Sequence, residues 1–372
     1  MPLIPGYQAL QLVTNACLFG RDLHELCVIF QSVILPVYNA EKWLDQCLQS
    51  VYEQTFTGRF ELSVFNDASQ DSSMDILENW RLKLEKRAVV VTRSDNENGS
   101  PKGVGYAKNQ AFKQSSGKYL CFLDADDVMH QDRISQQLRT TQVDARALVG
   151  CQFHRLPEGS TVRYTHWANN LTPEQLYTQA YTSHGPTLIM PTWFCSREAY
   201  LAVGGFDERG KGTPEDLIFF YKHLELGGEL RLVQQDLLMY RYHPEATTFS
   251  VLEDTIWELR VKFLEKMVLS KWSTFTIWNA GKQGRKLYRS LSDLNRKKVV
   301  NFCDVDEKKI QKQFYTFEDS SELPKPKVPI VHFTQAQPPL IICVKMDLTG
   351  GGFEVNLSSL HLCEGKDYIH FN

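Results

Sequence analysis

The sequence predicts an α/β protein with a mainly parallel sheet, helices on both faces of that sheet, and a second, smaller α/β unit. Short apolar strands alternate with helical segments from residue 32 onward, and this alternation restarts after about residue 271. A helix that joins two strands of one sheet makes them parallel, because it returns the chain to the same edge. The 372 residues allow two or three domains.

In the first unit, apolar runs predict strands, and apolar residues at helical spacing predict helices. Ligands of such sheets bind at the carboxyl ends of the strands, so we expect the site in the segments that follow them. The expected strands cover 32–37, 60–65, 88–92 and 118–123, and the expected helices follow Asn39 as a cap or cover 74–84 and 105–114.

The middle of the chain, from about 147 to 250, is expected to hold shorter strands. A threonine followed by a proline is typical of the beginning of a helix, and this pair occurs at Thr172-Pro173 and Thr213-Pro214. In the second unit we expect strands over 275–278, 299–303, 329–333, 340–344 and 368–371, and helices over 285–291 and after Gly350-Gly351-Gly352. We divide the chain into an N-terminal segment (1–31), a main domain (32–250), a linking helix (251–270) and a C-terminal domain (271–372).

The composition is that of a folded globular protein, with 42% hydrophobic and 23% charged residues. It argues against disorder and coiled coil as the main architecture. With 41 Lys and Arg against 44 Asp and Glu, the net charge is −3, so the whole chain lacks the charge of a typical nucleic-acid binder. A local basic patch stays compatible with this balance.

Nine cysteines lie far apart with no C-x-x-C pair, which predicts free core cysteines in a reducing compartment and hence a cytoplasmic protein. There is no run of 18 uncharged apolar residues, so we expect no membrane span. Charged residues interrupt the apolar stretch of residues 1–31, which therefore fits poorly with a signal peptide. We expect this segment to pack on the body or to fray.

Three carboxylates follow the strand at 118–123, in Leu123-Asp124-Ala125-Asp126-Asp127. Carboxylates this close repel one another unless something compensates their charge. A hard divalent cation, Mn²⁺ or Mg²⁺, bound between carboxylate and phosphate oxygens would do so. The alternative is an acidic turn in which an aspartate only caps the chain.

Three further motifs stand in order along the first unit, namely Pro36-Val37-Tyr38-Asn39, Asn66-Asp67-Ala68-Ser69 and Ala107-Lys108-Asn109. Together with the acidic motif, this set resembles the inverting family 2 glycosyltransferases of the GT-A type, over residues 32 to about 245. The resemblance implies a GT-A nucleotide-diphospho-sugar transferase fold and a UDP-sugar donor.

The resemblance also assigns donor contacts. Pro36, Tyr38 and Asn39 would border the base and ribose, although Asn39 as a helix cap alone is the alternative. Asp67 would accept a hydrogen bond from uracil. Lys108 stands where arginine is common, and would keep a positive charge near the phosphates without the planar fork of arginine.

The same resemblance implies metal ligands. Asp124 would face the ribose or the metal, and Asp126 would bind Mn²⁺ or Mg²⁺ across the diphosphate. His243, in Tyr240-Arg241-Tyr242-His243, would bind the metal or contact a phosphate. A structural histidine is the alternative.

On the acceptor side, the pair Glu215-Asp216 opens a helix. The resemblance makes Asp216 the general base and Glu215 a substrate-binding neighbour; charge at a helix start is the alternative. Trp193 is a candidate to stack on a sugar or base, or else to pack in the core.

The C-terminal domain opens on a damaged dinucleotide fingerprint, because Asn279 occupies the first glycine position before Gly281 and Gly284. We interpret it as a Rossmann-like remnant, with binding of a nicotinamide cofactor as an alternative. Residues 282–298 hold seven Lys and Arg against one Asp. They form either a solvated helix face or a surface that contacts phosphates.

The whole chain also resembles a group of vertebrate enzymes that add galactose to queuosine in tRNA. This implies UDP-galactose as the donor and tRNA-Tyr carrying queuosine as the acceptor, with no membrane partner. Transfer from UDP-GlcNAc or another UDP-sugar to a glycan stays open, as does a non-catalytic scaffold that binds RNA or protein.

Overall fold

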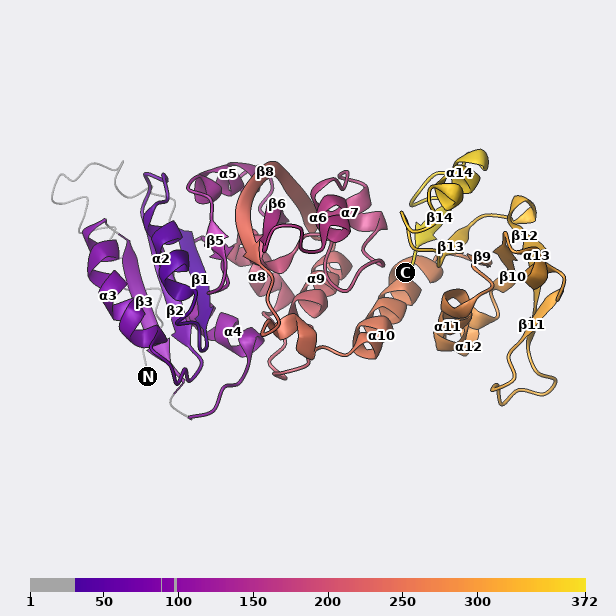
Figure 1. The fold of residues 1–372 in the computed structure, drawn as a ribbon, viewed down its shortest axis with the longest axis horizontal. Helices are drawn as coiled ribbons and strands as arrows, with labels where there is room; N and C mark the ends of the chain where they lie inside the picture. Colours follow the sequence, from indigo (N-terminus) through magenta and orange to yellow (C-terminus); the bar gives the residue numbers. More distant parts are fainter. Residues whose placement is uncertain (1–30, 88, 97–98) are drawn as a thin grey trace, which may run out of the picture.

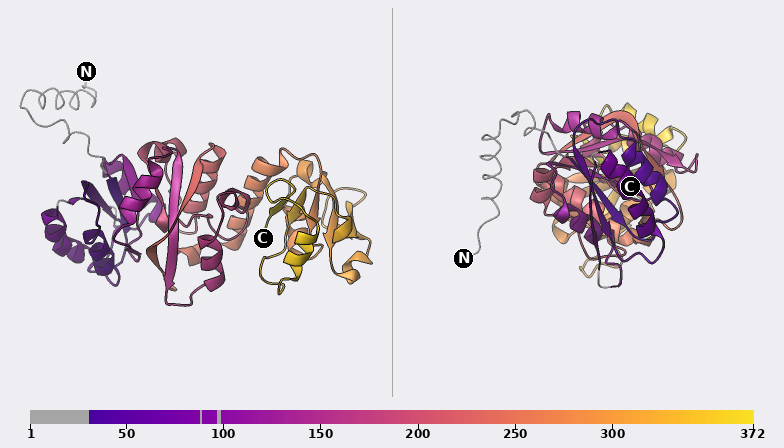
Figure 2. Two further views of the ribbon diagram at one scale, coloured as in Figure 1. Left: turned by 90° about the horizontal axis from the view of Figure 1, so that it is seen from above. Right: turned by 90° about the vertical axis from the view of Figure 1, so that its left-hand side faces the viewer.

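The computed structural model describes residues 31–87, 89–96 and 99–372. The predictions for the segment 1–31 therefore lie almost wholly outside the described residues. Two β-sheets organise the described chain, one formed by residues 31–241 and the other by residues 275–370. The two sheets lie towards opposite ends of an elongated molecule, with a helix between them (Figure 1, Figure 2).

The first sheet has eight strands, and its strand order mixes parallel and antiparallel pairs. In spatial order the strands are β3 (Val90–Asp95), β2 (Phe60–Asn66), β1 (Gln31–Val37), β4 (Tyr119–Phe122), β7 (Phe194–Ser196), β6 (Ala147–Leu156), β8 (Glu229–Arg241) and β5 (Val128–Met129). The first four are parallel to one another, as the strand–helix alternation predicted. β7 runs antiparallel to both its neighbours, and β5 runs antiparallel to β8.

The prediction of short strands in the middle of the chain is wrong for two of them. β8 has 13 residues and β6 has 10, the longest strands in the described chain. They pair with each other in parallel over most of their length. Three consecutive exposed polar residues, Gln234-Gln235-Asp236, interrupt β8 where its pairing with β6 shifts register, and they hide its length from a search for apolar runs.

The helices of the first unit are α2 (Leu44–Tyr52), α3 (Ser73–Lys86), α4 (Val104–Gln114), α5 (Arg133–Thr141), α6 (Val162–Asn169), α7 (Gln175–Thr178), α8 (Arg197–Val203) and α9 (Glu215–Glu225). They include the predicted helices and three that were not predicted, α5, α6 and α8. α9 begins directly after Pro214, as the threonine–proline signal predicted. The same signal at Thr172-Pro173 produces only the single turn of α7.

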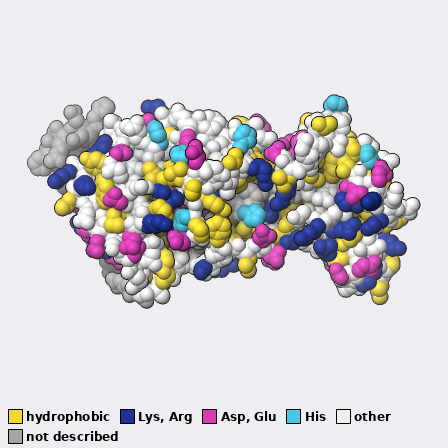
Figure 3. Space-filling model, in the orientation of Figure 1, with side chains coloured by type: hydrophobic (Ala, Val, Ile, Leu, Met, Phe, Trp, Pro, Cys, Tyr) yellow, Lys and Arg dark blue, Asp and Glu magenta, His cyan; other side chains and the backbone are white. Residues whose placement is uncertain are grey.

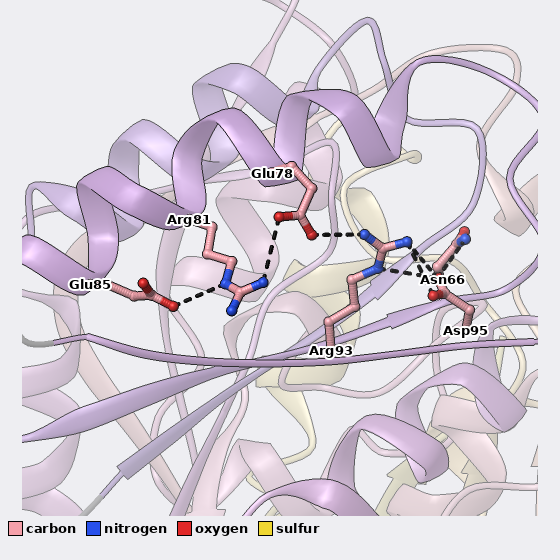
Figure 4. Close-up of polar contacts among 6 residues, drawn as sticks. All are labelled: Asn66, Glu78, Arg81, Glu85, Arg93 and Asp95. Carbon is pink, nitrogen blue, oxygen red and sulfur yellow. Dashed lines mark hydrogen bonds and ion pairs between the residues drawn. The ribbon is translucent and has the colours of Figure 1, made fainter.

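A chain of ion pairs joins α3 to the edge strand β3 (Figure 4). Arg93 on β3 contacts Glu78 of α3 at 3.0 Å and Asp95 at 3.1 Å. Asp95 in turn accepts a hydrogen bond from Asn66 at the end of β2. Each exposed pair contributes at most about 1 kcal/mol, but the network fixes the strand end that precedes Asp67.

The second sheet has six strands in the order β11 (Phe314–Thr316), β12 (Lys327–His332), β10 (Val299–Asp304), β9 (Phe275–Trp278), β13 (Leu340–Ile342) and β14 (Tyr368–His370). All pairs are parallel except β11 with β12. The accompanying helices are α11 (Lys282–Ser290), α12 (Asp293–Arg296), α13 (Glu307–Ile310) and α14 (Gly352–Ser359). α10 (Glu253–Leu264) continues into a π-helical turn (Glu265–Leu269) and connects the two sheets.

Burial explains most of the cysteines. Within the described residues all seven cysteines are free, and six of them are buried in the core. This confirms the expectation of core thiols for that part of the chain. None of the described helices is long and apolar enough to cross a membrane.

Candidate active site

The loops after β1 and β2 meet at the carboxyl edge of the sheet. Gln70 donates its backbone N–H to Asn39 Oδ1 at 2.8 Å, and Asn39 donates its own to Ser69 Oγ at 3.0 Å. Asn39 has a left-handed φ of +47° and α2 begins only at Leu44, so its predicted role as a helix cap is wrong. Its carboxamide instead ties the two loops together. Tyr38 beside it is 49% exposed, as a base-stacking residue requires.

Two predicted donor contacts lie deeper than expected. Pro36 is buried within β1, opposite Phe65, so it reaches a nucleotide only through its neighbours. Asp67 is 2% exposed, and its carboxylate accepts backbone N–H bonds from Lys102 and Gly103 and a side-chain bond from Asn96. Asp67 therefore holds the 99–103 loop in this structure, and its contact with uracil stays a prediction.

The acidic motif forms a tight turn between β4 and β5. Asp124 and Asp126 are partly exposed, whereas Asp127 is fully buried and accepts the backbone N–H of Arg241 at 2.9 Å. Burial raises the pKa of Asp124 to about 6 against the opposing charge of Lys108, and the charge of Asp126 adds to the rise. The Oδ1 atom of Asp124 is buried and lies 3.6 Å from Lys108 Nζ, so this oxygen faces the lysine.

The segment after β8 closes over this turn. His243 Nε2 forms a hydrogen bond with Asp126 Oδ2 at 2.8 Å, which brings together two residues that were predicted to bind one metal ion. Arg241 donates from Nε to the backbone oxygen of Asp126 at 2.9 Å, and its guanidinium stacks 4.2 Å from the centre of the Trp43 ring. The sequence had singled out His243 but not Trp43 or Arg241, whose roles depend on contacts across 198 positions.

Lys108 joins the acidic turn to the start of α9. It is 1% exposed, and its Nζ lies 3.6 Å from Asp124 Oδ1 and 3.3 Å from Glu215 Oε1. Burial by itself lowers the pKa of Lys108, but the carboxylates of Asp124 and Glu215 raise it above its ordinary value. The lysine thus lies beneath the site as a buried positive bridge, rather than in an open phosphate cleft.

Asp216 lies next to this bridge and is only partly buried. Burial, and after it the charge of Glu215, raises the pKa of Asp216 to about 7 against the opposing charge of Lys108. One of its oxygens accepts the N–H of Leu217 at 2.7 Å, and the other lies about 4.0 Å from where a side chain on Gly185 would begin. A carboxylate with a pKa near 7 at a partly open position suits a general base.

One predicted substrate contact is wrong. Trp193 is fully buried, and it donates its indole N–H to the backbone oxygen of Leu188 at 2.8 Å. Its ring packs against Phe206, Phe219 and Phe220. A fully buried indole cannot stack on a sugar or base, so Trp193 belongs to the core that supports α9.

The sequence also missed an aromatic group beside the site. The guanidinium of Arg155, at the end of β6, lies 4.5 Å from the ring centre of Tyr240, 5.0 Å from that of Tyr242 and 5.2 Å from that of Tyr164. The charge of Asp216 contributes to raising the pKa of Tyr164, after burial, to about 12. Arginine among tyrosines has no fixed spacing in a sequence, so no motif signals this group.

Two side chains could hold a divalent cation, Asp126 and His243, and Asp124 lies in the same acidic turn. Among residues 31–87, 89–96 and 99–372 no group of three or more His, Cys, Asp or Glu could enclose a metal ion. Two protein ligands fit an ion that takes its other oxygens from water and a diphosphate, as Mg²⁺ and Mn²⁺ do. The residues present therefore fit a metal shared with the donor.

In the C-terminal unit, the residues of the dinucleotide fingerprint form hydrogen bonds with other residues of this chain. Asn279, with φ +111°, accepts the N–H of Gly281 on its side chain. The carboxylate of Asp304 accepts hydrogen bonds from the backbone N–H groups of Ala280, Val305 and Asp306. It also forms an ion pair with Lys309. These bonds occupy the oxygens that a ribose would need, which favours the interpretation as a packed remnant.

Known proteins that are similar to this chain are glycosyltransferases. The sequence model described as "Glycosyl transferase family 2" matches residues 32–204. A glycosyltransferase of Bacillus subtilis (strain 168), EpsJ, is 26% identical over 228 residues, which is 58% of this chain and 62% of that protein. The teichuronic acid glycosyltransferase TuaG of the same organism is 34% identical over 107 residues, 29% of this chain and 40% of that protein. The chain thus spans less than two thirds of the length of both.

Similar solved structures include Staphylococcus aureus TarS 1–349 in complex with UDP-GlcNAc, with a TM-score of 0.48, 19% identity and 71% of each chain covered. The mannosyltransferase PcManGT of Pyrobaculum calidifontis, in complex with GDP-Man and Mn²⁺, has a TM-score of 0.48 and 16% identity, with 65% of this chain and 64% of that chain covered. The family match covers β1 to α8 and the whole acidic turn. Residues 32–204 are thus similar in sequence to family 2 glycosyltransferases, and this part of the chain has the mixed α/β fold of the GT-A type.

Proposed function

We propose that the protein is an inverting galactosyltransferase that transfers galactose from UDP-galactose to queuosine in the anticodon of tRNA-Tyr. The observation that carries the transferase part is the arrangement of Asp124, Asp126 and Asp216, two carboxylates at the donor turn and one at the start of α9, linked through Lys108. The acceptor and the galactose rest on the resemblance of the whole chain to the enzymes that modify queuosine.

The donor is held by the acidic turn and the loops beside it. Asp126 and His243 would hold the divalent cation, and Asp124 would complete the contacts to the ribose or the ion. Such a cation, when bound, offsets the negative charge that develops on the departing diphosphate. Tyr38 offers an exposed ring to the base, and Asn39 keeps its loop in place.

The acceptor is activated at α9. Asp216 takes the proton from an acceptor hydroxyl while that oxygen attacks the anomeric carbon of the sugar. The bond from the sugar to the diphosphate breaks in the same displacement, so the configuration at the anomeric carbon inverts. The negative charge of Glu215 helps to raise the pKa of Asp216, and the charge of Lys108, which pairs with Glu215, opposes this rise.

The free thiols support a protein that works in a reducing compartment, and we propose the cytoplasm. tRNA is present there, which agrees with the proposed acceptor.

The proposal is tested by incubating the full chain with UDP-galactose, Mn²⁺ and tRNA that carries queuosine, followed by nucleoside mass spectrometry. We expect the mass of one hexose on queuosine, and no hexose with Asp216→Asn. If the preparation hydrolyses the donor but adds no hexose to this tRNA, the proposed acceptor is wrong. tRNA without queuosine is the matched control.

The second candidate is transfer of N-acetylglucosamine to a glycan. A 104-residue segment is 35% identical to a Staphylococcus aureus (strain Mu50 / ATCC 700699) protein named poly(ribitol-phosphate) beta-N-acetylglucosaminyltransferase. A screen of UDP release from UDP-galactose, UDP-glucose and UDP-GlcNAc separates the two candidates, since each predicts a different preferred donor.

A further inference from the structure

The cations of the second unit gather on one side of it. Residues 271–372 contain fifteen Lys and Arg against eleven Asp and Glu, a net charge of +4, whereas the chain as a whole carries −3. Lys and Arg side chains form a row across this end of the molecule (Figure 3). The excess of positive charge is therefore local to the second unit.

The row is built on α11 and the loop that approaches it. Lys282, Arg285 and Arg289 recur at helical spacing on α11, so they lie on one face. Arg285 stacks 5.2 Å from the ring centre of Tyr315, and Arg289 lies 3.4 Å from the Tyr315 hydroxyl. Lys312 is exposed in the turn that precedes β11, the strand that carries Tyr315.

α13 completes the surface at the start of α11. A side chain placed on Gly281 would begin 3.5 Å from Lys309 Nζ, which puts α13 against the first turn of α11. Lys308 on α13 is exposed. We define the basic face as Lys282, Arg285, Arg289, Lys308 and Lys312.

The members of the basic face are not neutralised by the protein. None of the five forms an ion pair within the described part of the chain, whereas the neighbouring Lys286, Arg296 and Lys309 are paired with Asp254, Asp293 and Asp304. Nε of Arg285 is buried and has no hydrogen-bond partner. The unpaired cations are the groups that an anionic ligand would contact.

A series of contacts connects this face with the catalytic base. Gly185 lies near Asp216, and the loop that contains it is bonded through the Tyr181 backbone oxygen to Arg260 of α10. α10 also pairs with α11 through Asp254 and Lys286 and through Trp257 and Ser290. α10 thus contacts both the loop near Asp216 and α11, the helix that carries three residues of the basic face.

We propose that the basic face binds the phosphate backbone of the RNA acceptor while the modified nucleoside reaches Asp216. This inference rests on the proposed function and names the surface that would give it a macromolecular acceptor. Backbone phosphates are recognised by unpaired Lys and Arg, and the exposed Phe314 beside Lys312 offers a ring to an unstacked base. The face lies outside the family 2 match, so it would separate an RNA-directed enzyme from relatives that act on other acceptors.

The test compares two triple charge reversals in the full chain. Lys282→Glu with Arg289→Glu and Lys312→Glu removes the basic face, and Lys86→Glu with Lys113→Glu and Arg139→Glu makes the same charge change at exposed positions of the first unit. Binding of queuosine-containing tRNA is measured from 50 to 300 mM salt. We expect the first variant to bind at least about tenfold more weakly, and the slope of log K against log salt to fall by about 2 to 3, since each lost phosphate contact removes close to one unit. The control should keep both values.

Further readouts distinguish the inference from the proposed function. Both variants should release UDP from the donor alone at the wild-type rate, which shows that they are folded. Equal tRNA binding by both triples, or loss of heparin and tRNA binding in equal measure, would overturn the basic face as an RNA site. If the wild-type protein binds tRNA through this face but transfers no hexose, the result contradicts only the proposed function. If the basic-face variant transfers hexose to tRNA as well as the wild type does, the result contradicts only the inference.

Discussion

Lys108 Nζ lies 3.3 Å from Glu215 Oε1, and this contact joins α4 to the first turn of α9 across 107 positions of the sequence. Because Lys108 also lies 3.6 Å from Asp124, one buried cation holds the donor turn and the catalytic helix together.

Lys108→Met should therefore destabilise the fold as well as the site. Removing one partner of a buried ion pair leaves an uncompensated charge and costs about 3–5 kcal/mol of unfolding free energy. Denaturant unfolding measures this loss. Adding Glu215→Gln to Lys108→Met should recover part of the stability, because it removes one orphaned charge. A double variant no more stable than the single one would contradict the bridge.

Asp216→Asn should lower kcat by about 10²–10⁴-fold, the usual contribution of a general base, and leave the KM for the donor nearly unchanged. Its melting temperature should be equal to or above that of the wild type, because a carboxylate whose pKa is raised by burial is an unfavourable charge in the fold. Transfer rates and calorimetric scans check the two halves. The exposed pair of Asp236 with His154 offers the matched control Asp236→Asn, which should change neither value.

The reaction should slow on acidification. Asp216 works only when ionised, and its pKa of about 7 means that about nine tenths of it is protonated at pH 6. At saturating donor and acceptor, kcat should therefore rise with pH by about tenfold from pH 6 and level off above pH 8. A rate that stays constant or increases towards pH 6 would exclude Asp216 as the base.

Loss of either candidate metal ligand should weaken the donor. His243→Ala or Asp126→Ala removes one of the two side chains that meet at 2.8 Å, and binding of UDP in the presence of Mn²⁺ should fall by at least about tenfold, or 1.4 kcal/mol. Isothermal calorimetry with and without the metal measures this. In both variants the difference between the two conditions should shrink; an undiminished response to Mn²⁺ would place the ion elsewhere.

Trp193 should behave as a core residue. Trp193→Ala should cost about 3–5 kcal/mol of unfolding free energy, because it removes the ring that packs beneath α9. Trp193→Phe should retain most of the stability and leave the KM values for donor and acceptor unchanged. An acceptor KM raised severalfold in the folded Phe variant would restore its role in substrate binding.

Local patterns predicted much of this protein because strands and helices are encoded at short range. The observed β1 at Gln31–Val37, β2 at Phe60–Asn66 and α4 at Val104–Gln114 lie within one or two residues of their expected bounds. The full length of β8 was not predicted, because the polar residues Gln234, Gln235 and Asp236 separate its apolar residues.

The site was predictable to the extent that its residues follow strand ends. Asp124, Asp126 and His243 come together because β4 and β8 end at the same edge of the sheet. Trp193 has the composition of a stacking residue, and only packing decides that it is buried. Lys108 was expected at a phosphate, and its partnership with Glu215 depends on how α4 meets α9 in space.

The acidic turn and the end of β8 share their hydrogen bonds. β5, which starts directly after Asp127, pairs with Leu238 and Met239 of β8, and Arg241 bonds to both Asp126 and Asp127. These bonds can only open together, so the amide hydrogens of this region should exchange with solvent as one cooperative unit. Opening of this unit would displace Asp126 and His243 together, because both belong to the segments that these bonds join.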